Sequence, residues 1–278
     1  MNTATTPFPR WDDAATAGMD EPRLLLYRSN LLGSDLRITN YGGGNTSAKI
    51  VHKDPLTGQD VEVLWVKGSG GDVGSMKLDG FSTLYMDKLR ALQGLYRGLE
   101  HEDEMVGYLP HCTFNLNTRA ASIDTPLHSS LPYAHVDHMH PDAVIAIAAM
   151  ANSEAITRKV FGGTVGWMPW LRPGYELGQQ LKAYNEAHPG LRGIVLGGHG
   201  LFSWGETSRA CYENTVNLIE TAQNWLAAER AERRVQVFGG AQVESLPEAQ
   251  RDATLARVLP VLRGLASAQG VVGRRRGA

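Results

Sequence analysis

The chain of 278 residues carries 27 basic and 29 acidic side chains, so its net charge near neutral pH is -2. This balance excludes a broad basic surface for nucleic acid or an anionic membrane, and the length allows one large core or two small ones. Two cysteines, Cys112 and Cys211, are too few for a disulfide framework and predict reduced thiols in a cytoplasmic protein. No signal-peptide pattern is visible, and no apolar run reaches the ~18 residues of a membrane span.

The first predicted elements are an arm, a helix and a hairpin. Residues 1–18 predict a flexible N-terminal arm. Asp20 and Pro22 are typical of a helix start, and leucines follow them. Residues 38–52 predict a hairpin whose turn is the glycine-rich run 42–47.

A strand and a helix come next. Residues 61–66 predict a strand that ends in a second glycine loop at 67–71. Residues 81–97 predict one helix, because their leucines recur at helical spacing. Those leucines are Leu84, Leu89, Leu92 and Leu95.

The second half of the chain alternates helices and strands. Residues 122–126 predict a loop, because Pro126 disfavours helical angles at the residue before it, and 129–134 predict a short helix. Residues 135–140 alternate as a strand does, and Pro141 then suits the start of a helix over 142–150, although β-branched residues leave a second strand open there. The remaining predictions are helices over 102–109, 154–161, 175–187, 206–233 and 247–265 and strands over 193–196 and 201–204.

The order of these elements indicates the domain organisation. No repeat with a period of about 20–50 residues and no internal linker is visible. We therefore predict a single α/β domain over residues 19–237, followed by a helical C-terminal extension over 238–278.

Three histidines form the most informative pattern. His138 and His140 are two residues apart on a predicted strand, so their side chains face the same way. His199 stands between two glycines and can approach from another segment. Three imidazoles with one open position make a catalytic zinc site, but spacing alone leaves structural histidines equally open. The histidines that compete for these roles are His111, His128 and His135. His135 lies an odd number of residues from the pair, so we expect it on the other side of the strand.

Two glycine loops and one aspartate add to this pattern. Neither loop completes the P-loop or the dinucleotide-binding pattern, so a dinucleotide fold is unsupported. Loops of Gly, Asn, Ser and Thr nevertheless suit a small anion such as phosphate, the alternative being two tight turns. Asp124 could shuttle protons beside a metal, although most loop aspartates are caps or turn formers.

Five segments, taken in order, resemble the class II (zinc) aldolase/adducin family. They are residues 44–47, 67–70, 122–124, 138–140 and 198–200. The resemblance covers nearly the whole chain and looks closest to the aldolase part of the bifunctional rhamnulose-1-phosphate aldolase/alcohol dehydrogenases. It implies a three-layer α/β/α sandwich around a central, largely antiparallel sheet, with a helical C-terminal extension, and a homotetramer.

The resemblance also assigns residues. The implied ligands of one zinc ion (Zn²⁺) are His138, His140 and His199. The implied phosphate-binding residues are Asn45, Ser69, Gly70, Ser122 and, as a further contact, Lys67. Asp124 occupies the acid/base position.

The implied reaction is the reversible cleavage of a ketose 1-phosphate, rhamnulose 1-phosphate being favoured, to dihydroxyacetone phosphate and lactaldehyde. On this resemblance, zinc would serve as the Lewis acid that stabilises the negative charge left by cleavage, and Asp124 would protonate C3. The simpler aldolases of the family carry Glu at this position, whereas the sugar-phosphate 4-epimerases carry Asp, so an epimerase is the alternative.

Two further expectations complete the interpretation. A non-catalytic, adducin-like scaffold is the alternative from another class, and the intact histidine triad argues against it. The bifunctional relatives continue into a nicotinamide-dependent dehydrogenase domain, whereas this chain ends at Ala278, so we expect no NAD binding. We expect a small phosphorylated sugar as the partner, and no nucleic acid or membrane.

Overall fold

The computed structural model describes residues 7–40, 43–233 and 243–267. The chain divides into two compact units, Met1–Glu229 and Arg230–Ala278. Among the described helices, none combines the length and the apolar character that crossing a membrane requires.

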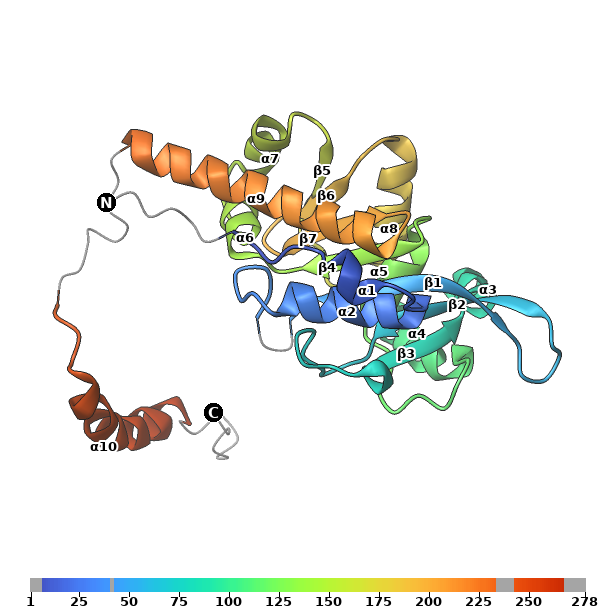
Figure 1. Ribbon diagram of the computed structural model, residues 1–278, viewed down its shortest axis with the longest axis horizontal. Coiled ribbons are helices and arrows are strands. Elements are labelled where there is room, and N and C mark those ends of the chain that lie inside the picture. The colour runs from blue at the N-terminus through green and yellow to red at the C-terminus, as the bar shows by residue number, and fades with distance from the viewer. Residues whose placement is uncertain (1–6, 41–42, 234–242, 268–278) are drawn as a thin grey trace. The chain divides into compact units, whose positions relative to one another are not determined.

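A seven-stranded sheet forms the centre of the first unit, in the order β3-β2-β1-β4-β7-β6-β5 (Figure 1). Neighbouring strands of the sheet are antiparallel, except β5 and β6, which run parallel. The prediction of a central, largely antiparallel sheet is therefore confirmed. The strands are β1 (Asn45–Lys53), β2 (Asp60–Lys67), β3 (Phe81–Tyr85), β4 (His135–Met139), β5 (Val165–Met168), β6 (Gly193–Leu196) and β7 (Gly200–Gly205).

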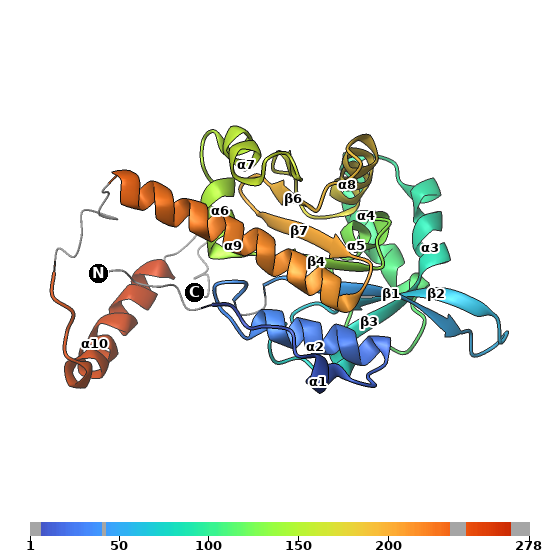
Figure 2. The ribbon, with the colours of Figure 1, turned by 45° about the horizontal axis from the view of Figure 1, so that its top comes forward.

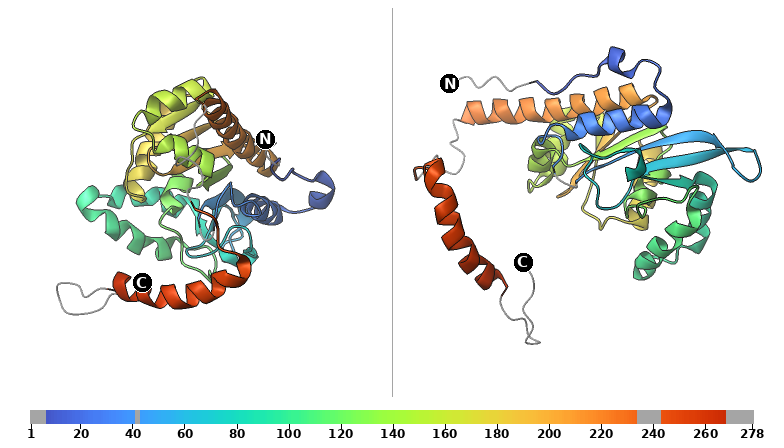
Figure 3. Two further views of the ribbon diagram at one scale, coloured as in Figure 1. Left: turned by 90° about the vertical axis from the view of Figure 1, so that its left-hand side faces the viewer. Right: turned by 60° about the horizontal axis from the view of Figure 1, so that its bottom comes forward.

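Helices cover both faces of this sheet. The described α-helices of the first unit are α1 (Asp13–Thr16), α2 (Glu21–Gly33), α3 (Met86–Ala91), α4 (Glu102–Tyr108), α5 (Thr125–Ser130), α6 (Asp142–Ala148), α7 (Ser153–Phe161), α8 (Tyr175–Ala187) and α9 (Ser208–Arg233), the last of which runs into the second unit. Four short 3₁₀ turns are η1 (Leu78–Gly80), η2 (Leu92–Leu95), η3 (Leu99–His101) and η4 (Leu109–Cys112). Figures 2 and 3 show α2 and α9 side by side on one face.

Two apolar clusters show how the layers are held together. One cluster joins α2, α6, α7 and α9 to residues such as Met139 and Leu201 on one face of the sheet. The other joins α5 and α8 to Val136 and Phe202 on the opposite face. Side chains alternate along a strand, so β4 sends Val136 and His138 toward α5, and it sends its odd-numbered residues toward α2 and α9.

Most predicted elements are confirmed. Asp20 caps α2 by accepting a hydrogen bond from the backbone N–H of Arg23. The segment after Pro141 forms α6 rather than a strand. The helices predicted over 102–109, 154–161, 175–187, 206–233 and 247–265 and the strands predicted over 61–66, 135–140, 193–196 and 201–204 are present with small shifts of their ends.

The predicted helix over 81–97 is wrong in its first part. Phe81–Tyr85 is strand β3, paired with β2, and only Met86–Ala91 forms an α-helix. The aromatic and β-branched residues of β3 favour a strand. Leu84, Leu89 and Leu92 share one core cluster, so their spacing reflects a common core and not one helix.

The predicted hairpin over 38–52 is also wrong. Both edges of β1 pair with other strands, β2 and β4, so no edge is left for residues 38–40. Ile38 instead ends a turn in which its N–H donates to the carbonyl of Asp35 at 2.9 Å, and Thr39 and Asn40 belong to no helix or strand. Tyr41 and Gly42, the first residue of the predicted glycine turn, lie outside the described residues.

Two shorter segments also depart from the prediction. Helix α5 covers Thr125–Ser130 instead of 129–134, so part of the predicted loop is helical. Pro126 stands in the first turn of α5, where a missing N–H costs no helical hydrogen bond. The short strand β5 was not predicted, because its four residues include one glycine and no clear alternation.

The two ends of the chain are described in part. Phe8, within the predicted arm, is buried, and the hydroxyl of Tyr212 in α9 donates to the carbonyl of Pro9. This part of the arm is packed, and residues 1–6 lie outside the described residues. In the second unit, the predicted helix is present as α10 (Glu248–Ala266), and none of its residues is buried. The rest of the predicted extension, 238–242 and 268–278, lies outside the described residues.

Candidate metal centre and substrate site

Three imidazoles converge at one end of β4. The Nε2 atom of His138 lies 3.0 Å from Nε2 of His140 and 3.3 Å from Nε2 of His199. One ligand nitrogen from each ring lies within 4.8 Å of the other two. Two nitrogens bound to a tetrahedral zinc ion at 2.0–2.1 Å are about 3.3 Å apart. The spacing of the three rings therefore fits a metal ion.

The protonation of these rings also suits metal binding. Nδ1 of His138 donates to the carbonyl oxygen of Leu201 at 3.1 Å, which leaves its Nε2 lone pair free. Burial lowers the pKa of all three rings: of His138 well below its usual value, of His140 to about 4, and of His199. The rings are therefore neutral near pH 7, the form in which imidazole binds metals.

Glycines around His199 permit this convergence. Gly198 has a φ of +64°, a conformation that L side chains rarely adopt. A Cβ on Gly200 would lie 2.8 Å from a ring carbon of His140 and 2.7 Å from the carbonyl oxygen of Met139. The expectation that flanking glycines let a third imidazole approach is confirmed by this close packing.

Asp124 lies at the N-cap position of α5 and contacts Asn45 in β1, the strand that pairs with β4. Its Oδ2 accepts a short hydrogen bond from the amide Nδ2 of Asn45, and the hydroxyl of Ser122 lies 3.5 Å from the same oxygen. Asn45 in turn pairs with His138 across β1 and β4. Burial raises the pKa of Asp124, and the charge of Lys67 partly opposes this. The carboxyl group is thus held near the histidines in surroundings that favour its acid form.

The other residues expected to bind phosphate occupy two adjacent segments. The N–H of Ser69 donates to the carbonyl of Ala120 at 2.9 Å, and Gly68 and Ala121 form an antiparallel bridge. The loop of Ser69 and Gly70 therefore lies beside the segment that carries Ser122. The amide nitrogen of Asn45 contacts Asp124, and the role of Asn45 in phosphate binding stays a prediction. Its Oδ1 is buried and has no hydrogen-bond partner among the described residues.

Lys67 connects the loop, the acid and the histidines. It is the last residue of β2 and is 3% exposed. Burial lowers the pKa of Lys67, while the carboxylates of Asp124 and Asp72 raise it. The charge of Lys67 also contributes to the lowered pKa of His140. The ammonium group is therefore within electrostatic range of both Asp124 and His140.

The competing histidines lie outside the metal group. His135 contacts Arg28 on the other side of β4, as the spacing predicts, and His128 pairs with the hydroxyl of Ser47 at 2.8 Å. His111 is exposed. Within the described part of the chain, the group of histidines, cysteines and acids with ligand-like spacing is the predicted triad.

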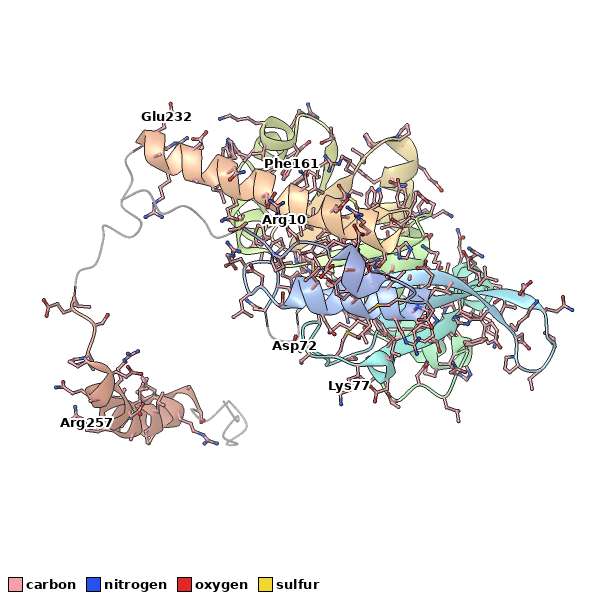
Figure 4. All side chains as sticks on the ribbon, viewed as in Figure 1. Arg10, Asp72, Lys77, Phe161, Glu232 and Arg257 are labelled. Carbon is pink, nitrogen blue, oxygen red and sulfur yellow. The ribbon has the colours of Figure 1, made fainter. Side chains whose placement is uncertain are left out.

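Two residues near the site escaped the sequence reasoning. Arg119 donates from Nη1 to the carbonyl of Ser69 at 3.3 Å, and its only sequence signal is a cation three residues before Ser122. Asp137 directly precedes His138 in β4 but faces the opposite way, where it pairs with Arg28. The sequence signal for Asp137 was an acidic side chain inside a predicted strand. Figure 4 labels Asp72 in the loop after β2, on the same side of the molecule as Lys77.

The chain is similar in sequence to a longer bacterial protein. Over 261 residues the chain is 41% identical to the uncharacterized oxidoreductase YuxG of Bacillus subtilis (strain 168), and the match covers 92% of this chain and 37% of that protein. The chain thus spans about a third of that relative's length.

Solved structures share the fold. An N-terminal class II aldolase domain of a conserved protein from Thermoplasma acidophilum is 32% identical with a TM-score of 0.70, covering 78% of this chain and 98% of that chain. A sugar-phosphate aldolase from Thermotoga maritima shares the fold at 12% identity and a TM-score of 0.55, covering 76% of this chain and 95% of that chain.

The decisive comparison is with a family model. Residues 24–226 match the model described as the class II aldolase and adducin N-terminal domain. This segment contains β1 to β7, the converging histidines, Asp124 and the loop of Ser69. The chain therefore belongs to the class II aldolase and adducin family.

Proposed function

We propose that the chain is a zinc-dependent aldolase that reversibly cleaves rhamnulose 1-phosphate to dihydroxyacetone phosphate and lactaldehyde. One observation carries the proposal: three neutral imidazoles converge beside a buried carboxyl group and a loop with a buried lysine. Zinc is the proposed ion, because three protein nitrogens with an open position are typical of catalytic zinc. The choice of rhamnulose 1-phosphate rests on the motif resemblance.

Different residues of the chain would bind the metal ion and the substrate phosphate. His138, His140 and His199 would hold the zinc ion. When bound, zinc would stabilise the negative charge that develops on a substrate carbonyl oxygen as the bond between C3 and C4 breaks. The loop of Ser69 and Gly70, with Lys67 and Ser122, would hold the phosphate, and this remote binding would orient the reacting carbons.

Asp124 would act as the acid of the cleavage direction. Its raised pKa favours the protonated form, so it can donate a proton to C3 after the aldehyde departs, while the proton of the C4 hydroxyl passes to water as that hydroxyl becomes the aldehyde. In the reverse direction the resulting carboxylate would remove the same proton. The amide of Asn45, which contacts Asp124, would keep the carboxyl group in place during both steps.

The test begins with the metal. Purified full-length chain should contain about one zinc ion, and EDTA should abolish release of dihydroxyacetone phosphate from rhamnulose 1-phosphate. His199→Gln should lose both metal and activity. His111→Gln is the matched control, because His111 is exposed and lies outside the metal group. Metal-free wild-type protein would remove the enzyme proposal altogether.

The same assay separates the alternatives. Asp124 is the observation that favours a sugar-phosphate 4-epimerase, since the epimerases that the chain resembles carry Asp there. Bound metal with epimerisation of a pentose phosphate, and no cleavage, would establish that activity instead. Bound metal without turnover of either substrate would indicate a scaffold.

The proposal includes the absence of nicotinamide chemistry from this segment. The description of YuxG as an oxidoreductase concerns a protein of which this chain matches 37%. Neither glycine loop of the chain completes the dinucleotide-binding pattern. NADH fluorescence should therefore not change when the chain is added. We also propose a homo-oligomer in the cytoplasm, and sedimentation velocity would test its size.

A further inference from the structure

Two cationic side chains flank one glycine of the loop after β2. If Gly71 carried a Cβ, that atom would lie 3.9 Å from Cε of Lys67 and 4.0 Å from Nε of Arg119. The positive charge of Arg119 contributes to the lowered pKa of Lys67. Two like charges therefore approach each other beside a loop in which Gly68, Gly70 and Gly71 carry no side chain. The carboxylates of Asp124 and Asp72 act on Lys67 more strongly than Arg119 does, and an anion bound beside the loop would offset the remaining repulsion between the two cations.

The backbone of Arg119 is fixed although its guanidinium is exposed. Its carbonyl accepts a hydrogen bond from the hydroxyl of Ser82 at 2.8 Å, and the next residue, Ala120, accepts one from the N–H of Ser69 at 2.9 Å. A Cβ on Gly68 would come within 2.7 Å of Cβ of Arg119, so the two segments touch. The base of the side chain is held while its end can reorient.

Most N–H donors of the Arg119 guanidinium have no hydrogen-bond acceptor among the described residues. Among the described residues, its hydrogen-bond acceptor is the carbonyl of Ser69, at 3.3 Å, and no carboxylate lies within ion-pair distance. The nearby Asp72 accepts from the N–H of Gly74 at 2.7 Å, and its charge and that of Asp124 act on Lys67. Arginine presents five N–H donors in a fork that matches phosphate oxygens, so most of that fork is available to a ligand.

We propose that Arg119 is a specificity-determining residue that, together with Lys67, selects substrates with a dianionic phosphate group over the same ketose without one. The inference rests on the proposed function, because it assigns the loop to the substrate's phosphate. Arg119 would supply bidentate hydrogen bonds at the exposed side of that group. Lys67 would supply a point charge at the buried side, toward Asp124 and the histidines.

The first test measures binding of inorganic phosphate to the zinc-loaded full chain by isothermal titration calorimetry. Arg119→Gln should weaken phosphate binding by about 10- to 100-fold, the usual range for a hydrogen bond to a charged group. Arg119→Lys should recover part of the loss, because it restores charge without the fork. Arg97→Gln is the matched control, since Arg97 is an exposed arginine paired with Glu104. Metal content and circular dichroism should be unchanged in all three variants.

The second test is kinetic. Arg119→Gln should raise KM for the ketose 1-phosphate and leave kcat nearly unchanged, because Arg119 contacts the phosphate and not the reacting carbons. The ratio of kcat/KM for the ketose 1-phosphate to kcat/KM for the unphosphorylated ketose should therefore fall. A merely structural role would lower both parameters for both substrates.

The outcomes separate the inference from the proposed function. Equal phosphate affinity of Arg119→Gln and Arg97→Gln, or no phosphate binding by wild type, overturns the inference whatever the reaction. Phosphate binding that depends on Arg119, in a chain that cleaves no ketose phosphate, refutes the proposed reaction and supports the anion site.

Discussion

The pKa of the Asp124 carboxyl group reflects two opposing effects. Burial raises its pKa, and the charge of Lys67 and the hydrogen bonds from Ser122 and Asn45 lower it. Burial is the largest of these, so the net shift is upward. The raised pKa brings the protonated and ionised forms of this carboxyl group closer in population, and reversible carbon–carbon cleavage requires a group that can both donate and accept a proton.

Replacing Asp124 by Asn tests this role directly. An Asn side chain has nearly the same shape and can still accept from the amide of Asn45, but it cannot transfer a proton. Asp124→Asn should therefore keep its zinc while turnover falls by at least about 100-fold. Steady-state kinetics and metal analysis give both values. Asp60→Asn, in an exposed ion pair with Lys53, is the control. Near-normal turnover of Asp124→Asn would remove this residue from the mechanism.

Buried neutral histidines should make the fold sensitive to acid. Burial, reinforced by neighbouring cations, lowers the pKa of His128 and of His135 to about 3. Below about pH 6.5 the unfolded chain takes up protons that the folded chain does not accept. Stability should therefore fall as the pH drops from 6.5 toward 3, by up to about 1.4 kcal/mol per pH unit for each such histidine.

Urea unfolding of EDTA-treated protein at pH 7, 6 and 5 measures this loss. Removal of the metal keeps its release at low pH out of the comparison. His128→Asn should lose stability at every pH but show a shallower decline between pH 6 and 5, since one buried imidazole is gone. The exposed His111→Asn should keep the wild-type slope. An unchanged slope in His128→Asn would mean that this histidine does not drive the acid loss.

Strand β4 serves the site and the core at once. His138 faces α5 and stacks on Phe202, with ring centroids 4.2 Å apart. Asp137 faces the opposite way, toward α2 and α9, where it accepts a hydrogen bond from the hydroxyl of Thr215 at 2.9 Å. A slip of one residue would exchange these faces. The buried carboxylate therefore fixes the register that points the histidines at the site.

Replacing Gly200, the first residue of β7 after the turn that follows β6, tests the close packing around the metal-site histidines. Gly200→Ala would push a Cβ to 2.8 Å from the ring of His140 and 2.7 Å from the carbonyl of Met139. The imidazoles should be displaced, so we expect zinc affinity to fall by about 10-fold or more, as for residues that support metal ligands. Competition with a chelator measures the affinity. Gly107→Ala is the control, because nothing lies within 4 Å of its added Cβ. Equal zinc affinity of the two variants would show that the turn tolerates the methyl group.

The sequence could predict the elements and residues whose pattern is local. The His-x-His alternation and the glycines beside His199 are visible in a few consecutive residues. Spacing alone left structural histidines equally open, and the family resemblance supplied the expectation that the three rings converge. Strand β3 was missed because Leu84 and Leu89 share a core through tertiary packing, which spacing cannot distinguish from a helix. The contact of Asn45 with Asp124 joins residues 79 positions apart, and no local pattern encodes it.

One buried side chain connects the layers of the fold behind the metal site. Arg28 of α2 is fully buried and donates to the carbonyl of Ser47 in β1 at 2.7 Å and to the hydroxyl of Ser208 in α9 at 3.1 Å. Its Nε lies 3.0 Å from Oδ1 of Asp137 in β4 but is poorly directed for a hydrogen bond, so charge holds this pair. Four elements thus depend on one guanidinium.

Arg28→Met should therefore lower the free energy of unfolding far more than the removal of one surface charge would. Methionine fills most of the space but leaves the carboxylate of Asp137 buried without its cation, a change that typically costs 3–5 kcal/mol. Urea unfolding measures the cost, and Arg23→Met, in the same helix but with a side chain 62% exposed, should lie within about 0.5 kcal/mol of wild type. Zinc affinity should also fall in Arg28→Met, because Asp137 sets the register of β4. If Arg28→Met matched Arg23→Met in both measurements, the buried pair would have no part in positioning the histidines. If stability fell while zinc affinity held, the pair would support the fold alone.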